Sequence, residues 1–140
     1  MIRLLIVEDN MYYSKYIINE IIKNSKNIKI EYIANNGKEA LEIMKKRHFD
    51  LITLDLKMPK CSGIEVINQI SNMKNIPQII VLSGESELIN KIQEKSIISR
   101  IINKYEDAKS IYTKNTRTSK YNRNKKREHN YKEKNYRRII

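Results

Sequence analysis

The 140-residue chain has little cysteine and no long apolar run, and each of these features excludes a class of protein. A single cysteine, Cys61, excludes an intramolecular disulfide framework. No run of 18 apolar residues is present, and the start of the chain shows no charged-then-apolar leader with a small-residue cleavage site. We therefore expect a soluble cytoplasmic protein with no membrane partner, long enough to bury one core.

Aliphatic residues are missing from residues 113–138, where Lys, Arg, Asn, Thr, Ser and Tyr dominate. Such a composition cannot bury a core. The formal net charge of +12 is also concentrated here, because residues 113–140 hold 11 basic and 2 acidic residues whereas residues 1–112 hold 17 and 14. We therefore predict a globular domain over residues 1–112 and a basic, disordered tail over residues 113–140.

Three interpretations of this tail stay open. It is a solvated extension, or it binds nucleic acid, or it is a truncation or reading-frame product that replaces the usual end of a domain. The second interpretation depends on clustered Lys and Arg that can contact phosphates and on Tyr121, Tyr131 and Tyr136 that can stack on bases.

Short apolar runs alternate with stretches of helical period along the first part of the chain. The expected strands are 2–7, 28–33, 50–55, 78–82 and 97–103, and the expected helices are 11–24, 38–47, from 63 onward, and 85–95. This alternation predicts an α/β fold with a doubly wound, five-stranded parallel sheet covered by helices on both faces. A further helix from Glu106 loses its apolar period after Tyr112, so we expect the last helix to be degenerate.

Polar residues follow four of the predicted strands, where the functional crevice of an open parallel sheet lies. They are Glu8 and Asp9, Asp55, Ser83, and Lys104. Three carboxylates that converge in one crevice repel one another, and a divalent cation with oxygen ligands, Mg²⁺, resolves this repulsion. Together with a lysine and a hydroxyl, such a site can hold a phosphoryl group covalently on an aspartate.

Four motifs carry a resemblance to a known family: VEDN at 7–10, DLITLDLKMP at 50–59 followed by Gly63 and Glu65, PQIIVLSG at 77–84, and Lys104 after an apolar strand. In this order they resemble the response-regulator receiver domain, which has the CheY-like variant of the flavodoxin-like fold. The resemblance covers residues 1–112. It implies a two-component phosphoprotein that signals by a phosphorylation-dependent conformational change.

The resemblance also assigns roles to individual residues. Asp55 corresponds to the phosphoacceptor, Ser83 to the switch hydroxyl and Lys104 to the lysine that pairs with the phosphoryl oxygens. Mg²⁺ would be held by Glu8, Asp9, Asp55 and the backbone carbonyl of Lys57. The donor would be a sensor histidine kinase or a histidine phosphotransfer protein, and the output would be docking to a partner or homodimerisation through the fourth and fifth strand–helix units. The domain would catalyse its own phosphorylation and dephosphorylation rather than act as a conventional enzyme.

Two positions depart from the family pattern. Ile101 stands where an aromatic residue is usual, and Tyr105 follows the lysine where proline is usual. Both departures bear on switching and leave the acceptor site itself unchanged.

Other interpretations of the same residues also exist. Glu8 and Asp9 could cap the helix that follows them, and Ser83 could cap the helix after the fourth strand. At the level of the whole chain, the alternative is a nucleic-acid-binding regulator that acts through the tail and has a vestigial receiver site. A Mg²⁺-dependent phosphohydrolase is disfavoured because such enzymes need a second acid where this chain has Lys57.

Overall fold

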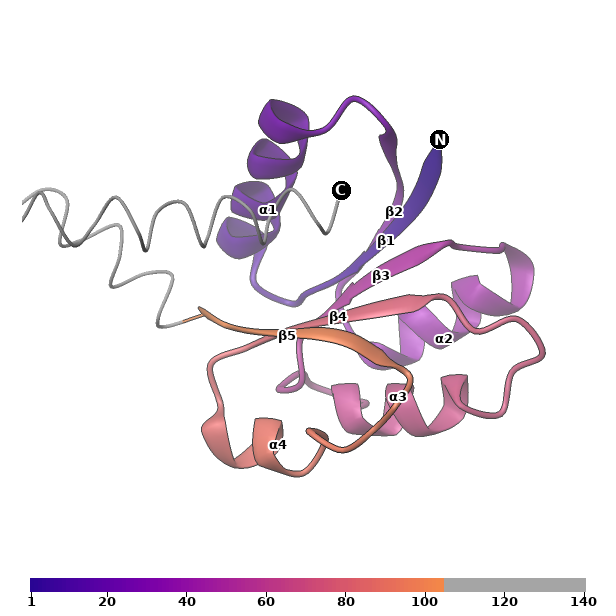
Figure 1. The fold of residues 1–140 in the computed structure, drawn as a ribbon, viewed down its shortest axis with the longest axis vertical. Coiled ribbons are helices and arrows are strands. Elements are labelled where there is room, and N and C mark those ends of the chain that lie inside the picture. The colour runs from indigo at the N-terminus through magenta and orange to yellow at the C-terminus, as the bar shows by residue number, and fades with distance from the viewer. Residues whose placement is uncertain (105–140) are drawn as a thin grey trace, which may run out of the picture.

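The computed structural model describes residues 1–104, and in this part of the chain five strands alternate with four helices (Figure 1). The strands are β1 (Ile2–Val7), β2 (Ile28–Ala34), β3 (Leu51–Leu54), β4 (Gln78–Ser83) and β5 (Ile98–Asn103). The helices are α1 (Met11–Asn24), α2 (Gly37–Lys46), α3 (Gly63–Ile70) and α4 (Ser86–Asn90). No helix in this part of the chain combines the length and the apolar character that crossing a bilayer demands.

The strands form one parallel sheet in the order β2-β1-β3-β4-β5. The predicted doubly wound five-stranded parallel sheet is therefore confirmed. The order along the sheet reverses direction after β1, so that β1 and β3 lie side by side near its centre. Because every strand runs the same way, the residues that follow the five strands lie along one edge, where a ligand site is expected in this class of fold.

Helices cover both faces of the sheet, α1 on one face and α2, α3 and α4 on the other (Figure 1). Alternate strand residues point to opposite faces. Leu5, Val7 and Leu54 belong to the larger buried cluster, whereas Leu4 and Ile6 belong to the smaller cluster on the α1 face. The strands are apolar on both sides because both of their faces are covered.

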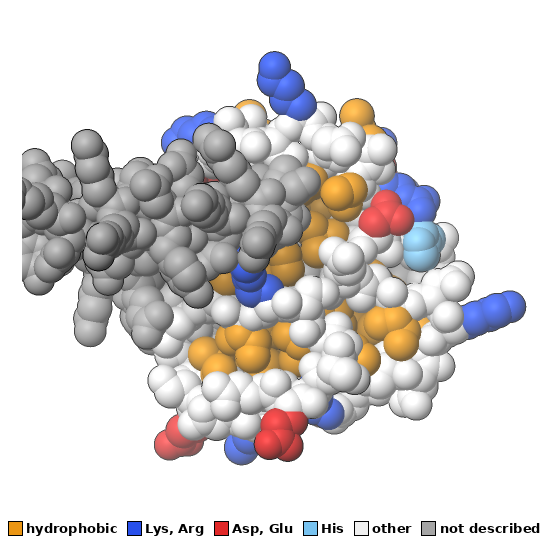
Figure 2. All heavy atoms as spheres, in the orientation of Figure 1, with side chains coloured by type: hydrophobic (Ala, Val, Ile, Leu, Met, Phe, Trp, Pro, Cys, Tyr) orange, Lys and Arg blue, Asp and Glu red, His pale blue; other side chains and the backbone are white. Residues whose placement is uncertain are grey.

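The edge strand β5 is only half-buried along most of its length. Its residues Ile98 and Ile101 pack, together with Leu88 and Ile89 of α4, against the larger cluster. Figure 2 shows apolar side chains gathered on the viewed face between β5 and α4. Ile101 therefore has a packing role on the sheet face that α3 and α4 cover.

One helix differs from the prediction. The expected helix 85–95 was wrong in its extent, because α4 ends at Asn90. The Ile92 N–H donates to the Ile89 carbonyl at 3.1 Å and the Lys95 N–H to the Ile92 carbonyl at 3.0 Å. The chain therefore continues as turns in which each N–H bonds to the carbonyl three residues earlier. These turns still bury Ile92 completely, which explains why its spacing matched a helical period. The predicted helix after residue 106, the domain boundary at 112 and the basic tail lie outside the described residues.

Candidate functional site

The backbone ladder extends past β1 and β3 and carries two carboxylates to the same edge of the sheet. The Glu8 N–H donates to the Ala34 carbonyl at 3.0 Å, and the Asp55 N–H donates to the Val7 carbonyl at 3.0 Å. Both residues are thus fixed by the hydrogen bonds of the sheet although each follows the end of its strand. Both are buried, with 2% of Glu8 and 7% of Asp55 exposed.

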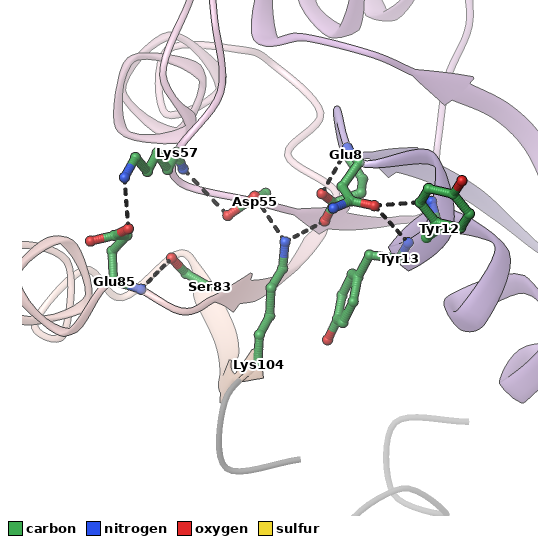
Figure 3. Close-up of polar contacts among 9 residues, drawn as sticks. Glu8, Tyr12, Tyr13, Asp55, Lys57, Ser83, Glu85 and Lys104 are labelled. Carbon is green, nitrogen blue, oxygen red and sulfur yellow. Dashed lines mark hydrogen bonds and ion pairs between the residues drawn. The ribbon is translucent and has the colours of Figure 1, made fainter. Parts of the chain in front are cut away.

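Lys104 reaches these carboxylates from the end of β5. Its Nζ lies 2.8 Å from Asp55 Oδ2 and 2.5 Å from Glu8 Oε2, and only 15% of its side chain is exposed (Figure 3). Charge-assisted hydrogen bonds of this kind are about twice as strong as neutral ones. The ammonium group therefore sits between the two buried carboxylates and offsets part of their repulsion.

Asp9 completes a cluster of three carboxylates. Glu8, Asp9 and Asp55 each offer one oxygen, and these oxygens lie within 4.8 Å of one another. Asp9 is exposed, which leaves the cluster open to solvent on its side. A set of carboxylate oxygens with an open side fits Mg²⁺, which usually takes one or two carboxylates and completes its coordination with water and phosphate oxygens.

Burial raises the pKa of Glu8, and the nearby negative charge of Asp55 adds to this effect. The hydrogen bond and the charge of Lys104 act in the opposite direction, as does the Asn10 N–H, which donates to Glu8 Oε1 at 3.1 Å. A buried carboxylate with a raised pKa gains from any further positive charge brought next to it. The site is thus electrostatically prepared for a cation.

Asn10 organises the start of α1 next to the cluster. Its side-chain Oδ1 accepts hydrogen bonds from the N–H groups of Tyr12 at 3.0 Å and Tyr13 at 3.1 Å. Asn10 is therefore the residue that caps α1, and the interpretation of Glu8 and Asp9 as helix caps was wrong. The carboxylates of Glu8 and Asp9 are therefore not used in capping α1.

A second group of contacts lies beside Asp55, on the loops after β3 and β4 (Figure 3). The Lys57 N–H donates to Asp55 Oδ1 at 3.3 Å, while the Lys57 side chain points the other way and its Nζ pairs with Glu85 Oε1 at 2.9 Å. The Glu85 N–H in turn donates to the Ser83 hydroxyl at 3.2 Å. The Lys57–Glu85 ion pair thus links the two loops, and the Glu85–Ser83 hydrogen bond ties the second loop to the end of β4.

Ser83 is fully buried at the end of β4, one strand away from Asp55. It does not cap α4, as one interpretation of the sequence held, because Glu85 occupies the N-cap position and no side chain caps that helix. The Ser83 oxygen accepts a hydrogen bond from the Glu85 N–H, and no acceptor for its own proton is found among residues 1–104, so the hydroxyl can donate to another group.

All six residues singled out from the sequence lie at this edge of the sheet. The structure brings Lys104 into direct contact with Asp55 and Glu8, and it places Asp9 in the same cluster. Tyr105, the second departure from the family pattern, lies outside the described residues.

Sequence reasoning missed two residues of the site. Tyr13 lies within the expected helix 11–24 and was given no site role, yet the Lys104 Nζ lies 4.3 Å from its ring centroid. Glu85 was taken as the start of a helix, yet it pairs with Lys57 across 28 residues of sequence. The position of Glu85, directly after a Ser-Gly strand end, was the one local signal for a site role.

Comparisons with known proteins point to one family. Residues 4–114 match the sequence profile of the response regulator receiver domain. The chain is 42% identical over 94 residues to response regulator mcs4 of Schizosaccharomyces pombe, covering 67% of this chain and 17% of mcs4. It is 36% identical over 87 residues to a protein-glutamate methylesterase/protein-glutamine glutaminase of Bacillus subtilis, covering 62% of this chain and 24% of that protein. The chain thus spans less than a quarter of the length of these two relatives.

Solved structures show the same fold. The response regulator TrrA of Thermotoga maritima, in complex with Mg²⁺ and BeF, superposes with a TM-score of 0.64 at 27% identity, covering 81% of this chain and 98% of TrrA. A DNA-binding response regulator of the LuxR family from Staphylococcus aureus gives a TM-score of 0.68 at 18% identity, covering 81% of this chain and 98% of that one. At that lower identity the likeness concerns the fold alone.

Proposed function

Because the chain belongs to the response regulator receiver domain family, we propose that Asp55 is its phosphoacceptor and takes a phosphoryl group from a sensor histidine kinase or a histidine phosphotransfer protein. The observation that carries this assignment is the contact of Lys104 Nζ with Asp55 Oδ2 at 2.8 Å inside a cluster of carboxylates. A buried aspartate that already faces a lysine has a counter-charge in place for the phosphoryl oxygens.

The proposed transfer is a displacement at phosphorus. A carboxylate oxygen of Asp55 attacks the phosphorus atom of the donor's phosphohistidine, the phosphorus–nitrogen bond breaks, and the donor histidine keeps the electron pair and takes up a proton. Lys104 supports this step by offering its N–H groups to the negatively charged phosphoryl oxygens as the phosphoryl group moves onto Asp55. The Ser83 hydroxyl supplies a second donor on the neighbouring strand.

Glu8, Asp9 and Asp55, together with the backbone carbonyl of Lys57, would hold Mg²⁺ at this site. The ion supplies, when bound, positive charge that offsets the charge of the transferring group. Two observations support the assignment: three carboxylate oxygens lie within 4.8 Å of one another, and the related TrrA was solved with Mg²⁺ and BeF.

The output is proposed to be docking to a partner, or homodimerisation, through the β4–α4 and β5 side of the domain. The link between Ser83 and Glu85 supports this choice, because a movement of the Ser83 hydroxyl toward a phosphoryl group would release the Glu85 N–H that begins the α4 segment. The alternative, a nucleic-acid-binding regulator with a vestigial site, is not favoured because Lys104 contacts Asp55 within the acidic cluster and the family match covers these residues.

The test is the mass of the intact protein after incubation with acetyl phosphate or phosphoramidate, with and without Mg²⁺. We expect a phosphoryl adduct that needs Mg²⁺ and that disappears in Asp55→Asn. Asp50→Asn is the matched control, because Asp50 lies just before the start of the same strand, at the opposite edge of the sheet, and should leave the adduct intact. An adduct that survives in Asp55→Asn, or no adduct in the unmodified protein, would contradict the assignment.

A further inference from the structure

We propose that Tyr13 is a positioning residue that holds the Lys104 ammonium group against Asp55 through the face of its ring. This inference rests on the proposed phosphoacceptor role of Asp55. The Lys104 Nζ lies 4.3 Å from the centroid of the Tyr13 ring, well within the range of a cation–π contact (Figure 3). Within residues 1–104 the ammonium group thus has three partners: the two carboxylates Asp55 and Glu8, and the Tyr13 ring.

The position of Lys104 in the fold explains why its ammonium group needs a further contact. It follows the last residue of the edge strand β5, and its ammonium group is carried on a flexible four-carbon stem. Its bond to Glu8 involves a carboxylate that is also a proposed metal ligand, so the oxygens of Glu8 have two roles to serve. The face of the Tyr13 ring is not a metal ligand. It therefore gives Lys104 a contact that does not compete with cation binding.

Tyr13 is itself held firmly by the start of α1. The Asn10 side-chain Oδ1 accepts a hydrogen bond from the Tyr13 N–H at 3.1 Å, and the Asn10 N–H donates to Glu8 at 3.1 Å, so one residue fixes two of the partners of Lys104. The ring of Tyr13 packs against Tyr16, with the ring centroids 5.6 Å apart, and it is half-buried against the smaller apolar cluster. The ring face therefore has little freedom to turn away from the ammonium group.

The expected effect of removing the ring follows from the burial of the Lys104 side chain. A cation–π contact shifts an equilibrium by roughly fivefold at an exposed site and by about thirtyfold when desolvated, and the Lys104 side chain is mostly buried. Tyr13→Leu keeps an apolar side chain but removes the ring, so the rate of phosphorylation by saturating acetyl phosphate should fall by a factor between these limits. Tyr13→Phe keeps the ring face and should stay within about twofold of the unmodified protein. Tyr12→Leu is the matched control, because Tyr12 is the adjacent residue on the same helix turn and is 79% exposed.

The contact is also visible without any phosphorylation. Protons that lie over an aromatic ring are shifted upfield in an NMR spectrum, so the Lys104 ε-methylene signals, assigned by their loss in Lys104→Met, should be upfield of those of other lysines. The shift should persist in Tyr13→Phe and disappear in Tyr13→Leu. Tyr13→Met serves as a second ring-free variant should Tyr13→Leu fail to show a cooperative melt.

The outcomes separate this inference from the function on which it rests. Loss of both the upfield shift and the rate in Tyr13→Leu, with rescue of both by Tyr13→Phe, supports the positioning role. An ordinary Lys104 shift in the unmodified protein, an unchanged rate in both ring-free variants, or a Tyr13→Phe variant as slow as Tyr13→Leu overturns it. Absence of any adduct in the unmodified protein overturns the proposed function, and the upfield shift then decides separately whether the ring holds the lysine.

Discussion

Replacing Gly63 by alanine should destabilise the domain by forcing α3 away from the loop that begins at Asp55. Gly63 is the first residue of α3, and its N–H donates to the Leu56 carbonyl at 3.0 Å. A Cβ atom at Gly63 would lie 2.2 Å from the Asp55 carbonyl oxygen and 2.7 Å from the Leu56 Cα. Both of these are backbone atoms, so no side-chain rotation can relieve the clash.

The size of the effect can be worked from these distances. Ordinary van der Waals contact begins at 3.4 Å, so helix and loop must separate by the difference from 2.2 Å, about 1.2 Å. Overpacking of this kind costs roughly 1–3 kcal/mol, and a stretched backbone hydrogen bond costs about 0.5–1.5 kcal/mol more. The better helix propensity of alanine offsets at most about 1 kcal/mol of this loss. From the midpoints of these ranges we expect the free energy of unfolding to fall by about 2–3 kcal/mol.

Urea denaturation followed by circular dichroism measures this loss directly. Gln69→Ala, on the exposed side of the same helix, is the control for introducing alanine and should change the free energy of unfolding by less than about 0.5 kcal/mol. A Gly63→Ala variant whose free energy of unfolding lies within that same margin of the unmodified protein would refute the steric argument. It would mean that the loop at Asp55 moves away without loss of stability.

Three further predictions concern other contacts of the domain. Lys60 has a φ of 64°, in the left-handed region, so Lys60→Gly should raise the free energy of unfolding in urea by about 0.5–1 kcal/mol; an equal gain in Lys60→Ala would contradict this cause. The Asn35 N–H and the Tyr32 hydroxyl hold the pKa of Glu39 below its ordinary 4.5. This stabilisation is present above pH 4.5 and is lost as the pH falls through the lowered pKa, so unfolding measured from pH 7 downward should show a weaker acid dependence in Glu39→Gln, and an identical dependence would count against it. The Lys57–Glu85 pair is largely exposed, with 72% and 40% of the side chains accessible, so a double-mutant cycle should give a coupling below about 1 kcal/mol that disappears in 1 M salt; a coupling that survives salt would show that the pair is shielded from solvent.

The fold was predictable because its signals are local. The apolar run Ile2–Val7 and the helical period of Met11–Asn24 match β1 and α1 residue for residue. The segment after β4 was less predictable, because the burial of Ile92 satisfies a helical period and a series of turns equally well. Periodicity reports which residues are buried, and it does not report which hydrogen bonds bring them there.

The site was predictable to the extent that it depends on strand ends. Asp55 and Glu8 follow buried strands, and a carboxylate at such a point is visible in the sequence. The contacts of Tyr13 and Glu85 were not visible, because each depends on the direction of a side chain on one loop or helix and the position of a partner on another. Tyr13 in particular shares its helical spacing with the core residue Ile17, so an apolar role explained it completely until Lys104 was seen above its ring.

The parallel direction of the strands connects the fold to the site. Lys104 and Glu8 are 96 residues apart in sequence, yet their side chains meet because β1 and β5 run in the same direction and end at the same edge of one sheet. In an antiparallel sheet the ends of alternate strands would lie on opposite edges, and the same polar residues would be divided between two sites. The parallel topology therefore brings the strand-terminal residues together in one charged site, and short contacts such as the Asn10 cap then decide how the side chains in that site face one another.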